Sequence, residues 1–574
     1  MNRFWMILAF CTSLAQAQTQ PSNIGRFCAD TFEEMIRDEP ERATGAGRHE
    51  YDNRWTDWSK AGRDQRNAHL QQRLDQLGAF RLDQLSAQDR LTARLMQYDF
   101  RIQLAAETAQ ELLLRVSQQN GYNEIYITVD RMPARTVQDY ENILARLRAV
   151  PAYVDQNLTL LDEATQRGLT QPKIVVDLVE KQLAAQISQD ANSTGLLAAF
   201  RRFPSNIPAS DQTRLRNQAV ETYQSQFLPA WRKLHDYIAG KYARAARAQA
   251  GLGSIPGGHE QYAALVRQYT TTTRTPAEIH NIGLEEVLRI EADMLKIARE
   301  TGFTGTLDEF RRKLDETPGQ HFHNKEEMLA YCRNIAKQIE PELPALFKRI
   351  PVLLYGIRPI PEDREAATAT NAQAPSPDYS APGWMNLNAY EPEKQFKFDK
   401  ESLVMHEAVP GHIFQLTIAR ALTDLPNYRK FYGNSAYIEG WGLYAESLGE
   451  QLHMYRDPYS RFGQLSSELF RAVRLVVDTG IHEKGWTREQ AIAYFREHAP
   501  AQSLAEIDRY IAWPGQALSY KMGQLRILEL RRQAERELGP KFDIREYHDV
   551  VLRDGVLPLE LLQEQVQEYI RSVK

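Results

Sequence analysis

Residues 137–168, "VQDYENILARLRAVPAYVDQNLTLLDEATQRG", show the pattern that decides the fold class. Their apolar side chains recur at helical spacing, and polar or charged residues fill the positions between them. Such a stretch buries one face and leaves the other in water, as an amphipathic helix does. We therefore predict helix over most of this segment.

Helix-start signals recur along the chain. The segment "TPAEIH" (275–280) is a capping box, with Thr275 as the N-cap and Glu278 at the third helical position. The segments "TLDE" (306–309) and "TREQ" (487–490) repeat this pattern. The sequence has no internal repeat of fixed period and no low-complexity tract. The chain is therefore predicted to be mainly α.

One region departs from the helical pattern. Residues 349–361 ("RIPVLLYGIRPIP") and 383–390 ("GWMNLNAY") have the composition of short strands, and a long loop separates them. We expect them to form a small β-hairpin near the candidate site described below. An edge strand of this hairpin is suited to pairing with an extended substrate, and a purely structural hairpin is the alternative.

Composition and charge are those of an ordinary globular protein. The 574 residues are 43% apolar and 25% charged, and the formal net charge is −5. This small charge and the lack of a long basic tract argue against binding to nucleic acid and against a polybasic contact with a membrane.

The first residues have the three parts of a secretory signal peptide. Arg3 precedes an apolar run, and the small-residue pattern "AQA" (15–17) follows it. We predict that residues 1–17 are removed and that the protein is exported, either to the periplasm or out of the cell. A lipoprotein signal at "LAFC" (8–11) is less favoured, because Phe10 is bulky where a small residue is expected.

The rest of the chain has no predicted membrane segment, since no other stretch approaches the roughly 18 continuous apolar residues that a span requires. After export, Cys28 and Cys332 are the cysteines that remain. They could pair in an oxidising compartment, but two cysteines in so long a chain do not make a disulfide framework. The sequence does not indicate an oligomeric state.

A nearly familiar metal motif lies at residues 404–415, "VMHEAVPGHIFQ". Zinc hydrolases often carry His-Glu-x-x-His, which places two imidazoles on one face of a helix. Here His406 and His412 are six residues apart. On a regular helix six residues advance about 600°, so the second imidazole lies about 120° from the first.

Pro410 and Gly411 offer a way to bring the two histidines together. Proline has no N–H to donate to the carbonyl of His406, and glycine tolerates the strained backbone that follows. A helical bulge of this kind adds residues without advancing the face, so His412 returns to the side of His406. The alternative is a pair of helix-end histidines bonded to backbone carbonyls.

A third metal ligand is expected from residues 435–450, "SAYIEGWGLYAESLGE". Glu439 and Glu446 are seven residues apart and lie on nearly the same helical face. We favour Glu439 as the ligand, because Gly440 and Gly442 beside it indicate close approach of another backbone. Glu446 is then placed to orient a ligand histidine. Spacing alone does not decide between the two carboxylates, and either one alone is more often a solvated residue.

If the site holds zinc, Glu407 is placed to take a proton from the attacking water. Residues 509–527, "RYIAWPGQALSYKMGQLRI", offer further groups. Tyr520 is the candidate donor to the oxyanion, although an amphipathic core tyrosine is nearly as common. Gln516 shares its face, and Lys521 or Arg509 is a candidate to bind a substrate carboxylate.

Residues 471–486 contain a second polar stripe, in which Arg471, Arg474, Asp478 and His482 share one face of an otherwise apolar helix. Such residues are costly to bury unless they are paired. A structural ion pair between Arg474 and Asp478 is one interpretation, and a lining of the cleft, with His482 as its most interesting member, is the other.

Several blocks taken together resemble one bacterial family, domain of unknown function 885 (DUF885). The blocks occur in order: "YTTTTRTPAEIHNIGLEEV" (269–287), "HEAVPGHIFQ" (406–415), "EGWGLYAE" (439–446), "RLVVDTGIHEKGWT" (474–487) and "PGQALSYKMG" (514–523). Members of this family look like helical zinc metallopeptidases, distantly similar to angiotensin-converting enzyme and thimet oligopeptidase.

The resemblance implies a large metallopeptidase-like helical fold with a central cleft or channel. Residues 18–574 would form a single domain, with lobes at 18–345 and 346–574 flanking the cleft. Family members often carry a second histidine where this chain has Ile413. The resemblance implies one zinc ion on His406, His412 and Glu439, with Glu407 as base and Tyr520 as transition-state donor.

The sequence therefore predicts an exported zinc peptidase that acts on short peptides or peptide-like amides. Two other functions remain open at this point. One is a non-catalytic helical protein that binds peptides, and the other is a zinc hydrolase that acts on a different amide or on an ester.

Overall fold

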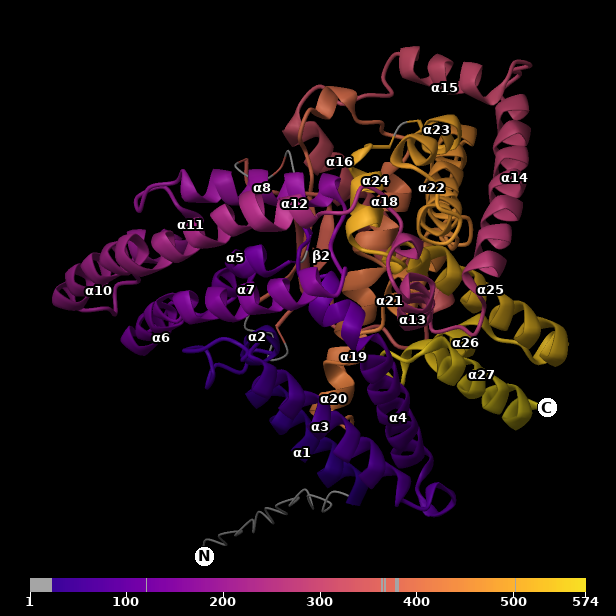
Figure 1. Ribbon diagram of the computed structural model, residues 1–574. Helices are drawn as coiled ribbons and strands as arrows, with labels where there is room; N and C mark the ends of the chain where they lie inside the picture. The colour runs from indigo at the N-terminus through magenta and orange to yellow at the C-terminus, as the bar shows by residue number, and fades with distance from the viewer. Residues whose placement is uncertain (1–22, 120, 363–364, 366–367, 377–380, 501) are drawn as a thin grey trace, which may run out of the picture.

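The computed structural model describes residues 23–119, 121–362, 365, 368–376, 381–500 and 502–574. The predicted signal peptide lies outside the described residues. Within them the chain is mainly α, as predicted (Figure 1). The helices of the first half are α1 (Asn23–Asp38), α2 (Pro40–Gly45), α3 (Lys60–Gly78), α4 (Ala87–Thr108), α5 (Ile125–Asp130), α6 (Val137–Arg148), α7 (Val150–Gln166), α8 (Lys173–Ile187), α9 (Ala198–Arg201), α10 (Ala209–Thr222), α11 (Leu228–Tyr237), α12 (Ala243–Ala245) and α13 (Gly258–Thr270).

The second half continues in the same way and contains the strands. Its helices are α14 (Pro276–Glu300), α15 (Leu307–Glu316), α16 (Lys325–Ile339), α17 (Leu343–Leu346), α18 (Lys400–Glu407), α19 (His412–Ala421), α20 (Asn427–Lys430), α21 (Ser435–Glu446), α22 (Pro458–His482), α23 (Arg488–His498), α24 (Ala505–Ala512), α25 (Ser519–Leu538), α26 (Ile544–Leu552) and α27 (Leu559–Val573). The strands are β1 (Tyr355–Pro359), β2 (Asn371–Gln373) and β3 (Gly383–Leu387).

The predicted helix starts are confirmed by their hydrogen bonds. Thr275, Thr306 and Thr487 each cap a helix, and in each case the side chain at the third position bonds back to the N-cap. The opening stretch 137–168 is helical but forms two helices, α6 and α7. Pro151 lies in the first turn of α7, where its missing N–H costs no helical hydrogen bond.

Two large hydrophobic cores organise the helices. One core joins the N-terminal α1 and α4 to α16, α18, α21 and the C-terminal α26 and α27. The other joins α6 to α11 with α14 and α22 to α24. Each core draws helices from both halves of the sequence, so the cores do not divide at residue 345. Figure 1 shows α27 beside α4, where Arg94 and Glu564 form an ion pair.

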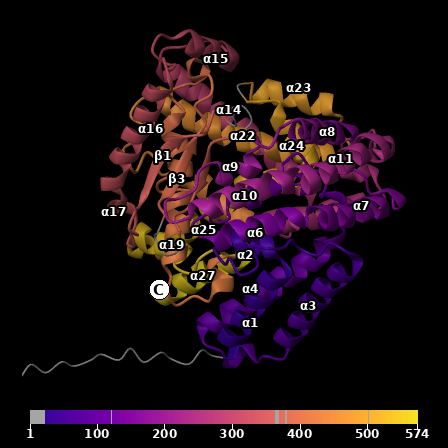
Figure 2. The same cartoon turned by 90° about the vertical axis from the view of Figure 1, so that its left-hand side faces the viewer.

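The small sheet differs from the predicted hairpin. The two predicted strands are present as β1 and β3, but they pair in parallel, with Tyr355 opposite Gly383. The antiparallel partner of β3 is β2, which lies in the segment predicted to be loop. Parallel strands need a long connection, and the residues between β1 and β3 provide one. Figure 2 shows β1 and β3 beside α16 and α19.

Close helix packing is built on glycine at two places. A Cβ on Gly440 of α21 would lie 2.4 Å from the Cα of Gly523 on α25, so the two backbones touch. A Cβ on Gly283 of α14 would lie 2.8 Å from Leu475 of α22. The close approach at Gly440 is the use predicted for that residue. It brings α21 and α25 together, and both helices contribute to the site described below.

The two cysteines are separate. Cys28 and Cys332 are both buried and both free, so the disulfide considered above does not form. Burial raises the pKa of each thiol to about 12. None of the described helices is long and apolar enough to cross a membrane.

Candidate metal centre

The chain turns sharply between the two motif histidines. Helix α18 ends at Glu407 and α19 begins at His412, so the helix is broken completely and does not merely bulge. A Cβ on Gly411 would lie 1.9 Å from the carbonyl oxygen of His406, which leaves room for no other residue there. The indole of Trp441 donates a hydrogen bond of 2.8 Å to the carbonyl of Pro410. The break thus lets the two histidines face each other.

Three side chains converge at this break. The imidazoles of His406 and His412 have centroids 4.7 Å apart and are nearly perpendicular. Oε2 of Glu439 lies 3.6 Å from Nε2 of His406 and 3.3 Å from Nε2 of His412. One donor atom from each of the three residues lies within 4.8 Å of the others. Tetrahedral zinc, with bonds of about 2.0–2.1 Å, separates its ligand atoms by about 3.3 Å, so the donor set suits such an ion.

Gly442 makes room for the imidazoles. A Cβ at this position of α21 would lie 2.9 Å from Nε2 of His406 and 3.0 Å from Cε1 of His412. The sequence predicted a close neighbour for this glycine but expected it to be backbone. The neighbours are the two imidazole rings.

Glu446 holds His406 from the other side. Its Oε1 lies 2.7 Å from Nδ1 of His406, and its Oε2 accepts a hydrogen bond of 3.0 Å from Ser402. A guanidinium nitrogen of Arg471 lies 3.7 Å from the same carboxylate. The hydrogen bond between Glu446 and Nδ1 of His406 leaves Nε2 of the same ring free to face Glu439. By contrast, Nδ1 of His412 is buried and has no hydrogen-bond partner among the described residues.

The cluster favours positive charge at its centre. Burial alone would lower the pKa of His406, but hydrogen bonds to Glu439 and Glu446 raise it to about 9. Burial would raise the pKa of Glu439, yet the bonds to both histidines hold it well below its usual value. Burial raises the pKa of Glu407, although the nearby histidines oppose the change. Glu407 is buried, with 9% of its surface exposed. Its carboxylate nevertheless makes no hydrogen bond or salt bridge with the described residues.

Tyr520 lies against this cluster. Its ring stacks on the imidazole of His406, with centroids 6.3 Å apart and planes 17° from parallel. Arg509 lies 3.4 Å from the phenol oxygen, and Arg474 stacks 4.4 Å from the ring centroid. Gln516 is held to the same group, because its Oε1 accepts a 2.6 Å hydrogen bond from Arg509. The structure thus brings these four residues to one side of the site.

Lys521 does not serve the role considered for it. Its side chain is fully buried, and its ammonium lies within 2.9 Å of Glu468, Glu286 and Gln524. An ammonium has three N–H donors, so all of them are used. The prediction that Lys521 binds a substrate carboxylate is therefore wrong, because helical spacing turns this residue away from its neighbour Tyr520.

The predicted ion pair between Arg474 and Asp478 is also wrong. Arg474 extends over the ring of Phe470, one turn earlier on α22, and donates 2.9 Å to Glu506. Asp478 accepts from the hydroxyl of Tyr262 at 2.6 Å and from the backbone N–H of residue 515 at 3.0 Å. Burial raises the pKa of Asp478 to about 7.

His482 has a structural role in place of the predicted one in the cleft. Its Nδ1 accepts from the N–H of Leu252 at 3.1 Å, and its Nε2 lies 3.0 Å from the carbonyl of Tyr510. Both nitrogens are therefore used. Burial lowers the pKa of His482 to about 3, so the ring is neutral at physiological pH.

Two contributing residues were not predicted from the sequence. Ser402 lies one turn before His406 on α18, a spacing that places both on one helical face. Glu506 lies three residues before Arg509 on α24, and it accepts from Arg474 as well. The helical spacing of Ser402 from His406, and of Glu506 from Arg509, could have indicated these two residues. Their partners Glu446 and Arg474 lie on other helices, and the sequence does not indicate those contacts.

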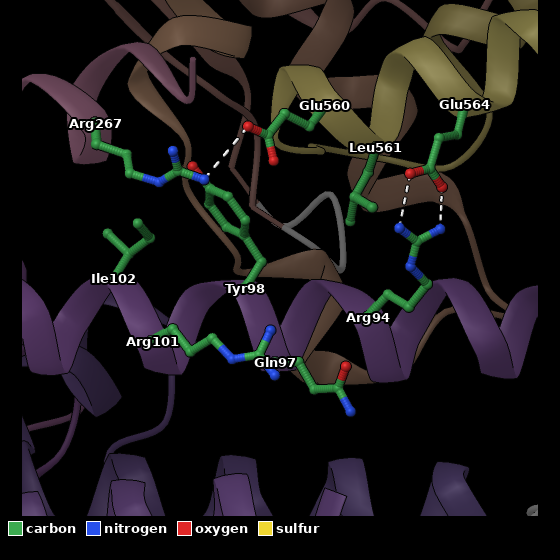
Figure 3. A pocket seen from close by; sticks show the side chains of 9 residues that line it. All are labelled: Arg94, Gln97, Tyr98, Arg101, Ile102, Arg267, Glu560, Leu561 and Glu564. Carbon is green, nitrogen blue, oxygen red and sulfur yellow. Dashed lines mark hydrogen bonds and ion pairs between the residues drawn. The ribbon is translucent and has the colours of Figure 1, made fainter. Parts of the chain in front are cut away.

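Two cavities lie elsewhere. Figure 3 shows one of about 250 Å³ between α4, α13 and α27, with ion pairs of Arg94 with Glu564 and Arg267 with Glu560 in its walls. A second, of about 500 Å³, is lined by Thr270 and its neighbours and by Met522. Met522 lies two residues after Tyr520 and therefore about 200° further around α25, on the side of the helix opposite Tyr520. Neither lining contains histidine or cysteine.

Solved structures of similar proteins share this fold. A chain from Colwellia psychrerythraea is 27% identical, covers 96% of this chain and 99% of its own, and has a TM-score of 0.90. A chain from Shewanella oneidensis is 19% identical, covers 95% of this chain and 99% of its own, and has a TM-score of 0.74. Both are called "putative lipoprotein". A structure described as "a putative oligoendopeptidase F" from Bacillus anthracis is 12% identical, covers 88% of this chain and 96% of its own, and has a TM-score of only 0.32.

Sequence comparison assigns the chain to a family. None of the curated proteins matches the chain. A family model described as "Bacterial protein of unknown function (DUF885)" matches residues 40–566, which is most of the chain. The resemblance seen in the motif blocks is thereby confirmed for this family. The chain belongs to the DUF885 family of bacterial proteins.

Proposed function

We propose that this protein is an exported zinc-dependent peptidase that hydrolyses short peptides or peptide-like amides. The observation that carries the proposal is the convergence of His406, His412 and Glu439, with the unpaired carboxylate of Glu407 beside them. Three protein ligands and an open position are typical of catalytic zinc, whereas structural zinc has four protein ligands.

The donor set suits a zinc ion. Two imidazole nitrogens and one carboxylate oxygen are ligands that zinc accepts, and their separations of 3.3 and 3.6 Å are close to the tetrahedral value. His406, His412 and Glu439 would hold the ion. When bound, zinc supplies a Lewis acid that polarises a carbonyl group and makes water more acidic.

The chain's own residues supply the remaining chemistry. Glu407 accepts the proton of the attacking water, because its carboxylate is near the ligand histidines and makes no hydrogen bond or salt bridge with the described residues. Tyr520 donates its phenol hydrogen to the oxygen that gains negative charge at the scissile carbonyl. Glu446 fixes the orientation of His406.

Glu407 separates this proposal from a protein that only binds peptides. A buried carboxylate without a partner is costly, and a binding site or a structural metal site gains nothing from it. A general base needs that carboxylate free. This is the reason to prefer an enzyme.

The test combines metal analysis with hydrolysis. We expect about one zinc per chain, activity on a mixed peptide library, and loss of that activity on chelation with recovery on zinc addition. Glu407→Gln should keep the zinc and lower kcat by about 10²–10⁴-fold. Full activity in this variant rules out the base, and peptide binding without turnover in zinc-loaded wild type supports the binding protein.

Export is part of the proposal. The signal sequence predicts cleavage after Ala17, and the names of the two similar structures favour the lipoprotein alternative at Cys11. Mass spectrometry of the mature N-terminus decides between them. A chain that starts at residue 18 indicates ordinary secretion, a lipid-modified Cys11 indicates anchoring, and an intact N-terminus contradicts export.

A further inference from the structure

Two arginines lie beside Tyr520. A guanidinium nitrogen of Arg509 is 3.4 Å from its hydroxyl, and the guanidinium of Arg474 is 4.4 Å from its ring centroid. The same ring stacks on His406. Two permanent positive charges therefore lie next to the group that we propose as the donor to the scissile carbonyl.

Among the described residues, one carboxylate is shared between these arginines. Glu506 lies 2.9 Å from Arg474 and 3.4 Å from Arg509. Burial opposes ionisation of Glu506, but the two arginines lower its pKa to about 2, so it carries its full charge. Asp478, which also lies near Arg509, has its oxygens bonded to Tyr262 and to a backbone N–H. The pair thus carries more positive than negative charge.

The two arginines have different access. The side chain of Arg474 is 5% exposed and lies over the rings of Phe470 and Tyr520, and its second terminal nitrogen is buried with no hydrogen-bond partner among the described residues. Arg509 is 18% exposed, and its contacts leave N–H donors unused. Arg474 is therefore a fixed source of charge, and Arg509 is the one able to touch a ligand.

We propose that Arg509, supported by Arg474, binds a carboxylate of the substrate within three residues of the scissile amide. This inference rests on the proposed function. A guanidinium binds a carboxylate through charge-assisted hydrogen bonds, which are stronger than neutral ones and hold the carboxylate in place. The preferred substrates are then short acidic peptides or peptides cut near a free C-terminus.

The distance sets the position of the carboxylate. The Arg509 nitrogen that lies 3.4 Å from the hydroxyl of Tyr520 also donates to Gln516, so the unused N–H groups of Arg509 are on its other nitrogens, about 2.3 Å away. With hydrogen bonds of about 2.8 Å at each end, the scissile oxygen and the bound carboxylate are at most about 11 Å apart. An extended chain covers about 3.3–3.6 Å per residue, so about three residues span this interval at most.

Two sources supply such a carboxylate, the chain terminus or an Asp or Glu side chain. The test compares three peptides. They are N-acetyl-penta-alanine with a free C-terminal acid, the same peptide with a C-terminal amide, and that amide with Asp in place of its last alanine. Binding is measured by calorimetry on zinc-loaded Glu407→Gln protein, so that turnover does not interfere. Hydrolysis and product masses are measured on zinc-loaded wild type.

We expect the free acid to bind about 30-fold more tightly than the plain amide. Arg509→Gln should bring the two within about 3-fold, and Arg509→Lys should keep part of the difference, because it keeps the charge. Arg488→Gln is the matched control, since Arg488 pairs with Asp508, next to Arg509, and makes no contact with Tyr520. Wild-type products should be fragments of one to three alanines from the C-terminal end.

Each outcome is decisive. If the Asp amide binds as tightly as the free acid, the site takes a side-chain carboxylate and the inference stands with that source. Equal binding of all three peptides, no binding of any, or a preference that survives Arg509→Gln overturns it. Selective binding without hydrolysis ends the proposed function and leaves Arg509 as a carboxylate-binding residue only, whereas hydrolysis without selectivity keeps the proposed function and ends the inference.

Discussion

Two buried histidine sites in this molecule have opposite environments. His482 has both ring nitrogens bonded to backbone groups, and burial lowers its pKa to about 3. His406 and His412 instead direct Nε2 towards one shared carboxylate, and the pKa of His406 is raised to about 9. Both sites drew attention in the sequence. The difference is whether the protein itself provides the partner for every nitrogen.

This difference separates a packing role from a chemical one. A buried imidazole with two neutral partners is fully satisfied and has nothing left to bind. Imidazoles that face a carboxylate and each other attract a cation, because the carboxylate stabilises positive charge at that point. The predictions below test this contrast.

The largest effect is expected from removing a ligand. His412→Ala should reduce zinc content from about one equivalent to near zero and lower zinc affinity by more than the roughly 100-fold seen for outer partners. His482→Ala should keep the zinc and lose stability, because it leaves two buried backbone groups without partners. Metal analysis and thermal unfolding measure both. Equal zinc content in the two variants would contradict the contrast.

A smaller effect is expected at Glu446. Glu446→Gln keeps the shape of the side chain and removes the charge that holds Nδ1 of His406. Zinc affinity should fall by about 10–100-fold. Competition with a chelator of known affinity measures it. Glu468→Gln, which removes a carboxylate from the Lys521 network, is the control and should leave zinc affinity unchanged.

Two glycines of α21 should respond differently to alanine. In Gly442→Ala the new Cβ lies 2.9 Å from Nε2 of His406, so zinc affinity should fall by about 10-fold or more. In Gly440→Ala the new Cβ meets the backbone of Gly523, and this clash should lower the free energy of unfolding by about 1–3 kcal/mol. The higher helix propensity of alanine offsets about 1 kcal/mol of this loss. Chelator competition and denaturant unfolding measure the two effects. The contrast fails if both variants lose only stability.

The last test concerns the pH dependence of stability. Because folding lowers the pKa of His482 from about 6.5 to about 3, its contribution to stability is complete above pH 6.5 and is lost as the pH falls towards 3. His482→Gln should therefore show a shallower loss of unfolding free energy over this range. His323→Gln, at an exposed position, should follow the wild type. An unchanged slope in His482→Gln would count against the neutral, buried histidine.

Much of the candidate site was accessible from the sequence. His406, Glu407, His412, Glu439 and Glu446 were all candidates from the sequence, although the bulge predicted at Pro410 is a full break and spacing did not decide between the two downstream carboxylates. Short-range geometry decides these features, so a single segment carries the signal. Lys521 and Asp478 were misassigned, because a residue's partners lie on helices that are distant in sequence.

The sequence by itself determined the helices, their capping boxes and the interruption between the two motif histidines. Each depends on contacts within a few residues, which the local sequence specifies. Only the tertiary structure decided that β1 and β3 run parallel, that Arg474 pairs with Glu506, and that both ends of the chain share one core. The reason is that a buried polar group takes the partner that long-range packing brings to it, and many partners are compatible with the same local pattern.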